Sequence, residues 1–262
     1  MEYLLSFIAC IFMALFAYFK NKLTKKATIL SLIFGIMIIF AGGYRSFLLL
    51  MFLFLMVTIS GSINRKKREE ITEGIHEKSG KRDHIQVFSN LFIATLSLVL
   101  YSVTKNEILY ITYACVIATS LADTLASDLG ILSNETPRNI VNGKKSEKGL
   151  SGSITVLGLL CSLFGSMLIA FLFFLLNDMR SDVFYLVAAV GFFGSIIDSV
   201  YGSLQVEYRC VSCNIKTEQK NHCNEKTMYF KGIKFLSNDL VNLFTSIDIF
   251  IIAIIIQTLL KL

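Results

Sequence analysis

Two aspartates that follow a long apolar run are candidates for catalysis or metal binding. The run covers residues 108–121, and Asp123 and Asp128 come soon after it, with Ser127 between them. Helical spacing places Asp123 and Ser127 on one face, and Asp128 about a quarter-turn further round. A carboxylate at the edge of hydrocarbon is costly unless it is paired, hydrated or bound to a metal. Because Mg²⁺ prefers oxygen ligands, the pattern indicates a magnesium site, with an ordinary polar helix end as the alternative.

Asp198 is a second carboxylate within an apolar run, the one over residues 184–204. Gly202 and Gln205 follow it at i+4 and i+7 spacing, so that all three share one face of a helix. The cost of placing a charge in hydrocarbon makes Asp198 a functional candidate for the same reason as Asp123.

Amide side chains mark the start of two further apolar runs. Asp83, Gln86 and Asn90 have i, i+3, i+7 spacing and form one stripe of a predicted helix. Asn238 and Asn242 share a face where the last run begins. Such residues either line a site or form a hydrogen-bonded seam between helices.

A loop rich in Gly, Lys and Ser precedes the apolar run that begins at residue 154. Three glycines, three lysines and three serines lie between residues 143 and 153. Glycine lets a backbone approach a ligand closely, and a helix N-terminus offers free N–H groups to phosphate. The Walker A pattern is absent. The loop therefore predicts either a phosphate-binding segment or a solvated basic loop.

Three cysteines and a histidine gather in one polar connection. They are Cys210, Cys213, His222 and Cys223. A Cys-x-x-Cys pair with a nearby His or Cys fits a structural zinc site, although adjacent His222 and Cys223 are hard to place around one ion. Unligated or redox-active thiols are the alternative. Cys10, Cys115 and Cys161 lie in apolar runs, where cysteine acts as a small apolar filler.

The composition places these residues in a membrane protein. The chain has 262 residues, 54% of them hydrophobic, with 22 Phe and one Pro, and its mean hydropathy is +0.64. These values are typical of an all-α polytopic integral membrane protein and exclude an ordinary soluble domain. We expect one membrane domain over residues 1–262, with residues 205–238 as a Cys-containing loop within it. The first apolar run lacks the features of a cleaved signal peptide and is expected to be a retained span.

The apolar runs and the basic residues alternate and so predict a topology. About eight apolar segments occur, near residues 3–19, 27–42, 47–63, 87–103, 108–122, 154–176, 184–204 and 240–260. Nearly all of the 25 lysines and arginines lie in the first, third, fifth and seventh connections; the exceptions are Arg45, Lys105, Arg180 and Lys261. The positive-inside rule then predicts that these connections are cytoplasmic and both termini extracytoplasmic, in the cell (inner) membrane. It also explains the net charge of +6 without any nucleic-acid partner.

Taken together, the polar motifs resemble the transmembrane protein 19 family, whose plant members act as phytyl-phosphate kinases. The likeness extends from Lys81 to the last apolar run. The 145–153 stretch is in addition similar to the Lys-Ser…Gly-Ser sequence of the CTP-dependent dolichol and phytol kinases. The Cys and His residues are not a feature of the plant or animal members, so a metal there is expected to be structural and accessory. The motifs begin at Lys81, Asp123, Asp198 and Asn238.

The resemblance implies a polyprenyl-phosphate kinase that transfers a phosphoryl group from CTP or ATP to a membrane isoprenyl monophosphate. It implies Mg²⁺ ligands at Asp123, Asp128 and Asp198. Donor phosphates would be held by Lys144, Lys145 and the loop over 149–153. Arg82 would hold the acceptor phosphate. Further substrate-binding residues are expected to be Asp83, Gln86, Asn90, Ser146, Gly149, Gly152, Ser153, Gln205, Asn238, Asp239 and Asn242.

Two other functions are consistent with the same residues. A transporter or flippase for an anionic lipid or metabolite would use Asp123, Asp198 and Asp248 to line a pathway. A membrane scaffold would use its Cys-containing loop to dock a partner. Phosphate transfer from CTP or ATP to a prenyl phosphate distinguishes the kinase from both.

Overall fold

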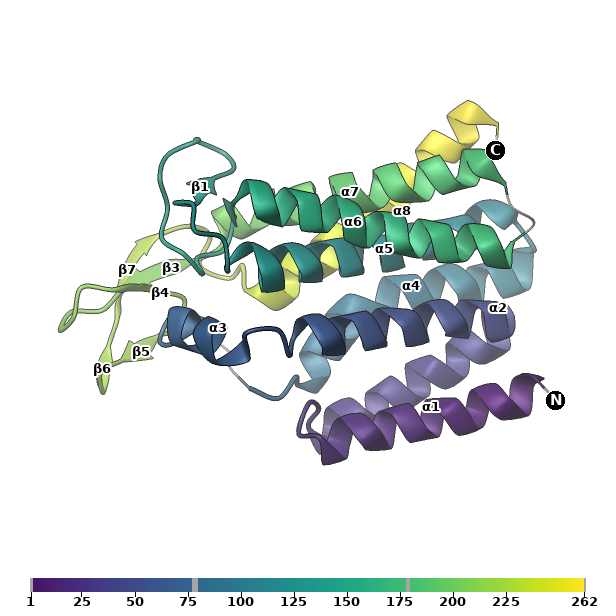
Figure 1. The fold of residues 1–262 in the computed structure, drawn as a ribbon, viewed down its shortest axis with the longest axis horizontal. Helices are drawn as coiled ribbons and strands as arrows, with labels where there is room; N and C mark the ends of the chain where they lie inside the picture. Colours follow the sequence, from purple (N-terminus) through teal and green to yellow (C-terminus); the bar gives the residue numbers. More distant parts are fainter. Residues whose placement is uncertain (1, 77–79, 178–179, 262) are drawn as a thin grey trace.

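The computed structural model describes residues 2–76, 80–177 and 180–261 and is a bundle of long helices with small strands at one end (Figure 1). Lys78, one of the basic residues in the third connection, lies outside the described residues. Seven of the described helices are long and apolar enough to cross a membrane. Those helices are α1 (Glu2–Phe19), α2 (Lys25–Ser60), α4 (His84–Thr104), α5 (Glu107–Gly130), α6 (Val156–Leu176), α7 (Ser181–Leu204) and α8 (Asn238–Leu260); α3 (Arg65–Thr72) is short and basic.

Helix α2 contains two of the predicted apolar segments. Gly43 interrupts it with φ 74° and ψ −175°, a conformation that glycine adopts without steric cost. The two halves run in opposite directions (Figure 1). The prediction of about eight apolar segments is therefore confirmed, although the second and third are joined at Gly43 without a polar connection.

Helix α5 is the centre of the bundle and contacts α2, α4, α6, α7 and α8. Every residue from 110 to 119 is buried, and small side chains such as Ala114 and Ala118 let neighbouring helices approach closely. The outer faces of the peripheral helices carry large apolar side chains, including Phe12, Phe40 and Phe164, which are more than half exposed. Helix α5 is therefore the most buried of the seven long helices, and apolar surface remains on the outside of the bundle.

Four connections lie at one end of the bundle, here called the loop end, and their described residues are 20–24, 61–76 with 80–83, 131–155 and 205–237 (Figure 1). Backbone hydrogen bonds join two of them, from Thr24 N to Arg82 O (3.1 Å) and from Arg82 N to Lys22 O (2.9 Å). Both chain ends lie at the opposite end (Figure 1). The connections that carry most of the lysines and arginines therefore lie together at the loop end.

The segment over 205–238, expected as a loop, folds into two small sheets. Strands β3 (Glu207–Arg209), β4 (Lys216–Thr217) and β7 (Met228–Lys231) form one sheet in the order β4-β3-β7. Strands β5 (Asn221–His222) and β6 (Glu225–Lys226) form a hairpin. A separate pair, β1 (Arg138–Asn139) with β2 (Ser153–Ile154), closes the connection before α6. These strands are too short to be recognised by alternation of apolar and polar residues.

Candidate active site

A cavity of about 340 Å³ opens at the loop end and brings most of the predicted site residues together. Its wall is made by the ends of α4 to α8 and by the connection before α6. Residues far apart in the sequence therefore share one space. The predicted residues that line it are Arg82, Gln86, Asn90, Asp123, Asp128, Gly149, Gly152, Ser153, Asp198, Asn238, Asp239 and Asn242.

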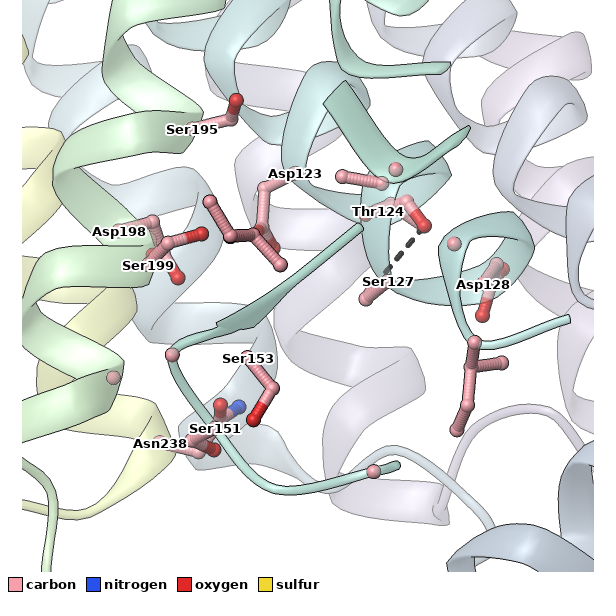
Figure 2. A pocket seen from close by; sticks show the side chains of 18 of the residues that line it. Asp123, Thr124, Ser127, Asp128, Ser151, Ser153, Ser195, Asp198, Ser199 and Asn238 are labelled. Atoms are coloured by element: carbon pink, nitrogen blue, oxygen red, sulfur yellow. Dashed lines mark hydrogen bonds between the residues drawn. The ribbon is translucent and has the colours of Figure 1, made fainter. Parts of the chain in front are cut away.

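Asp123 and Asp198 face each other across this cavity (Figure 2). Their carboxyl groups lie close enough to interact, and Thr245 Oγ1 donates to Asp198 Oδ2 (3.1 Å). Two carboxylates this close repel unless a proton or a cation lies between them. Helix α5 continues to Gly130, so Asp123 is held by a full helical turn beyond the apolar run. The pair has the oxygen chemistry that Mg²⁺ prefers.

Asp128 is separated from this pair. Its carboxylate forms an ion pair with Arg68 of α3, and Ser60 Oγ donates to it (2.7 Å). In Figure 2 it lies beyond Thr124 and Ser127, away from Asp198. Asp128 thus lines the cavity but ties α3 and the end of α2 to α5, whereas the sequence grouped it with the other two aspartates.

The amide side chains come from the first two turns of α4 and α8. Gln86 and Asp83 form a capping box, in which Asp83 Oδ1 accepts from Gln86 N (2.9 Å) and Gln86 Oε1 accepts from Asp83 N (3.0 Å). Asp83 therefore caps α4 and is absent from the cavity lining, while Arg82 beside it and Gln86 are part of that lining. Asn90 donates through Nδ2 to Gln86 O (2.8 Å).

The Gly- and Ser-rich loop forms the opposite wall. Gly152 has φ 74°, and a Cβ there would lie 2.4 Å from Ser203 N, so the loop packs directly on α7. Ser146 Oγ and Ser153 Oγ lie 2.6 Å apart and fix the start of the loop to its end. Lys148 lines the cavity and donates to Ser133 O.

Lys144 and Lys145 lie elsewhere. Both are exposed and belong to the turn that follows β1, where Lys145 bridges to Arg138. Neither lines the cavity, nor does Ser146. Of the three lysines in the predicted phosphate loop, only Lys148 is placed to meet a ligand in this cavity.

Sequence reasoning missed Glu218, which is buried and lines the cavity. Its Oε1 accepts from Ser151 Oγ (2.6 Å), and the buried side chain of Gln205 lies nearby. Burial raises the pKa of the Glu218 carboxyl, and the hydrogen bonds and nearby His76 act in the opposite direction. Gln205 is buried at the end of α7 and contacts the site through Glu218. No spacing in the sequence connects these residues.

Cys210, Cys213, His222 and Cys223 form a separate cluster in the strand-containing segment. Their ligand atoms all lie within 4.8 Å of one another, so the adjacent His222 and Cys223 do reach one centre. Backbone N–H groups, first that of Cys213, lower the pKa of the Cys210 thiol to about 6. None of the four lines the cavity. Cys10 and Cys115 are buried in the helices, as expected for apolar fillers.

Comparison with known proteins shows the family. The chain belongs to the integral membrane protein family DUF92, which it matches over residues 8–249. It is 31% identical over 200 residues to the uncharacterized membrane protein MJ0933 of Methanocaldococcus jannaschii, covering 75% of this chain and 80% of that one. It is 26% identical over 228 residues to Protein PGR of Arabidopsis thaliana, covering 78% of each. No solved structure matches the chain.

Proposed function

We propose that this DUF92 protein is a Mg²⁺-dependent kinase that transfers a phosphoryl group from CTP or ATP to an isoprenyl monophosphate in the membrane. The observation that carries the proposal is the Asp123–Asp198 pair inside a cavity that also presents Arg82, Lys148 and a Gly-rich loop. Phosphoryl transfer requires in-line positioning and neutralisation of charge more than covalent chemistry. The cavity supplies both kinds of group.

The two aspartates come from different helices and are the best candidates for the metal. When bound, Mg²⁺ would neutralise charge on the donor phosphates. Asp123 and Asp198 offer carboxylate oxygens, and the first two turns of α8 add the polar side chains of Asn238 and Asn242 to the cavity lining. Mg²⁺ keeps several waters and needs only one or two protein carboxylates beside substrate phosphates, so the pair is sufficient.

Two cations in the cavity lining, Lys148 and Arg82, suit two phosphate groups. Lys148 and the backbone over 149–153 are placed to bind the donor, because glycine there lets the chain approach phosphate oxygens closely. Arg82 lies at the start of α4 on the wall that also holds Gln86 and Asn90, where it is placed to hold the acceptor phosphate. An isoprenyl monophosphate is already ionised, so the reaction needs no strong general base.

The position of the cavity suits an acceptor with a lipid tail. Its lining extends from the loop over 149–153 to Ser162 and Ser195, which hydrogen-bond to each other within the membrane-crossing helices α6 and α7. A headgroup can therefore reach the aspartates while an apolar chain remains beside the exposed apolar faces of the helices.

A transfer assay on the purified protein tests this proposal. Protein in detergent is given Mg²⁺, γ-labelled CTP or ATP, and geranylgeranyl or phytyl monophosphate, with inorganic phosphate as the control acceptor. The proposal expects a labelled isoprenyl diphosphate and no labelled product from inorganic phosphate. Absence of product with both nucleotides, together with movement of the prenyl phosphate between vesicle leaflets, would favour the transporter in its place.

We also propose that the loop end faces the cytoplasm, where nucleotides are available. The split of basic residues between the two ends supports this orientation. A membrane-impermeant maleimide applied to sealed cells should leave a Lys144→Cys variant, whose substituted position is exposed at the loop end, unlabelled at that position until the membrane is opened. Labelling of intact cells at this position would reverse the topology.

A further inference from the structure

We propose that Cys210, Cys213, His222 and Cys223 bind one structural Zn²⁺, and that this zinc centre fixes Glu218 in the wall of the cavity. Neither the zinc site nor its effect on local order requires the protein to be a kinase. Its support is the geometry of the four ligands, the lack of an apolar core around them, and their contacts with two neighbouring connections.

The distances among Cys213 Sγ, Cys223 Sγ and His222 Nδ1 match those around a tetrahedral zinc ion. With Zn–S of about 2.3 Å and Zn–N of about 2.0 Å, a tetrahedral site requires sulfur atoms about 3.8 Å apart and sulfur–nitrogen distances of about 3.5 Å. Cys213 Sγ and Cys223 Sγ are 3.8 Å apart. His222 Nδ1 lies 3.4 Å from Cys213 Sγ and 3.2 Å from Cys223 Sγ. Four protein ligands leave no open position, as in structural rather than catalytic sites.

Two tight turns deliver these ligands. Cys210 and Cys213 flank the turn between β3 and β4, which Asn214 completes with φ 61°; Cys210 N donates to Ile215 O (3.0 Å). In the hairpin of β5 and β6, the two turn residues Cys223 and Asn224 both have positive φ, at 52° and 60°. That is the backbone of a two-residue hairpin turn. This turn directs the side chains of His222 and Cys223, which are adjacent in the sequence, toward the same point.

The segment lacks the apolar core that would otherwise hold it together. Its buried apolar residues over 206–236 are Val206, Cys210 and Leu236. Large side chains such as Val211, Met228 and Phe235 are more than half exposed. Small units of this kind are usually stabilised by disulfides or by a metal, and all of the described cysteines are free. Zinc binding would supply the missing free energy of folding.

The zinc centre is packed against the connection between α3 and α4. Gly74 has φ 75°, and a Cβ at this position would lie 2.5 Å from His222 Nε2. Strand β4 extends the contact, since Thr217 Oγ1 donates to Gly74 O (2.6 Å) and Glu218 N donates to Ile75 O (2.7 Å). The ring of His222 thus presents Nδ1 to the thiols and its other edge to Gly74.

The same strand places Glu218 against the loop that forms the cavity wall. Glu218 is the residue after β4 and bonds to Ser151 (2.6 Å). Lys216 Nζ forms an ion pair with Glu147 (3.0 Å) at the start of the loop. His76 Nε2 and Gly149 O lie 2.8 Å apart on the opposite side. Ordering of the zinc centre is therefore expected to order the loop over 149–153 through Glu218 and His76.

Metal analysis of the purified full-length protein tests the first half of the proposal. We expect about one equivalent of zinc per chain. The Cys213→Ser, Cys223→Ser double variant should lose it, while Cys161→Ser, in helix α6, should retain it. Replacement by Co²⁺ should give the visible absorption of a thiolate-bound ion. A metal-free wild type, or zinc that survives the double variant, would overturn the site.

Hydrogen–deuterium exchange tests the second half without reference to activity. Removal of zinc should increase exchange about tenfold in 72–76, 149–153 and 207–231 and leave the centre of α5 unchanged. Glu218→Ala should keep its zinc and increase exchange in 149–153 alone. Unchanged exchange in 149–153 after zinc removal would show that the zinc centre does not hold the cavity wall, and unchanged exchange there in Glu218→Ala would exclude Glu218 as the link.

Discussion

The aspartate pair of the cavity and the Cys/His cluster lie at the same end of the bundle but are built in opposite ways. Asp123 and Asp198 are hard oxygen ligands, 75 positions apart by residue number and brought together by two membrane-crossing helices. The four residues of the Cys/His cluster are soft ligands that lie within one short segment between 210 and 223. Ligand type selects the metal, so the first suits Mg²⁺ and the second Zn²⁺.

The two centres depend on the fold to different extents. The Cys/His cluster needs two local turns, and its four ligand atoms lie within 4.8 Å of one another without any contribution from the helices. The aspartate pair needs the whole bundle, and two carboxylates leave room for substrate phosphates beside a metal. We therefore assign chemistry to the aspartates and support of the cavity wall to the Cys/His cluster.

The largest expected effect is the loss of transfer in Asp123→Asn and Asp198→Asn. Each substitution keeps the size of the side chain and removes charge from the metal site, so transfer should fall by about a thousandfold. Thermal stability should be unchanged or higher, because a partly buried negative charge has been removed. Zinc content should be unaffected in both variants.

Asp248→Asn is the matched control, since Asp248 also lies in a membrane-crossing helix. It accepts a hydrogen bond from Tyr201 (2.7 Å) and lies outside the cavity lining. The steady-state transfer rate should stay close to that of the wild type. An equal loss in all three variants would remove the distinction between the aspartate pair and other intramembrane aspartates.

Asp128→Asn should have a smaller effect of a different kind. The substitution breaks a partly buried ion pair with Arg68, which should lower the free energy of unfolding by about 1–3 kcal/mol. Transfer should fall by about tenfold at most, because α3 loses its attachment while the Mg²⁺ ligands remain. Chemical denaturation and limited proteolysis within residues 61–72 measure this. A thousandfold loss at unchanged stability would place Asp128 in the metal site with the other two.

The smallest expected effects compare two lysines of one loop. Lys148→Ala should raise KM for the nucleotide by about tenfold, corresponding to one charge-assisted hydrogen bond. Lys145→Ala should change KM by less than about twofold, because an exposed charge away from the cavity is screened by solvent. Steady-state kinetics with varied nucleotide distinguish them. The reverse order would show that the exposed turn folds over the bound donor.

Much of this arrangement was predictable from the sequence, for physical reasons that can be stated. Carboxylates are rare in hydrocarbon, so Asp123 and Asp198 stood out before the fold was known. The apolar runs likewise predicted the helices. Gly43 did not stand out, because a single glycine inside an apolar run is compatible with an unbroken helix.

The remaining site residues depend on contacts between distant segments. Asp128 with Arg68, and Glu218 with Ser151, are each joined across at least 60 positions. A local periodicity carries no information about such partners. Glu218 lies in a segment that was predicted only as a cysteine-containing loop. The convergence of His222 and Cys223 on one point depends on a hairpin turn whose geometry was not predicted from the residue types.

Mn²⁺, a paramagnetic substitute for Mg²⁺, can report whether the aspartate pair binds a metal. Electron paramagnetic resonance can count Mn²⁺ bound to the purified, zinc-loaded protein in the presence of CTP or ATP. The account predicts saturable Mn²⁺ binding in the wild type and in Asp248→Asn, and its loss in Asp198→Asn with zinc content unchanged. Mn²⁺ binding to Asp198→Asn as tight as to the wild type would contradict the assignment of the aspartate pair as the metal site.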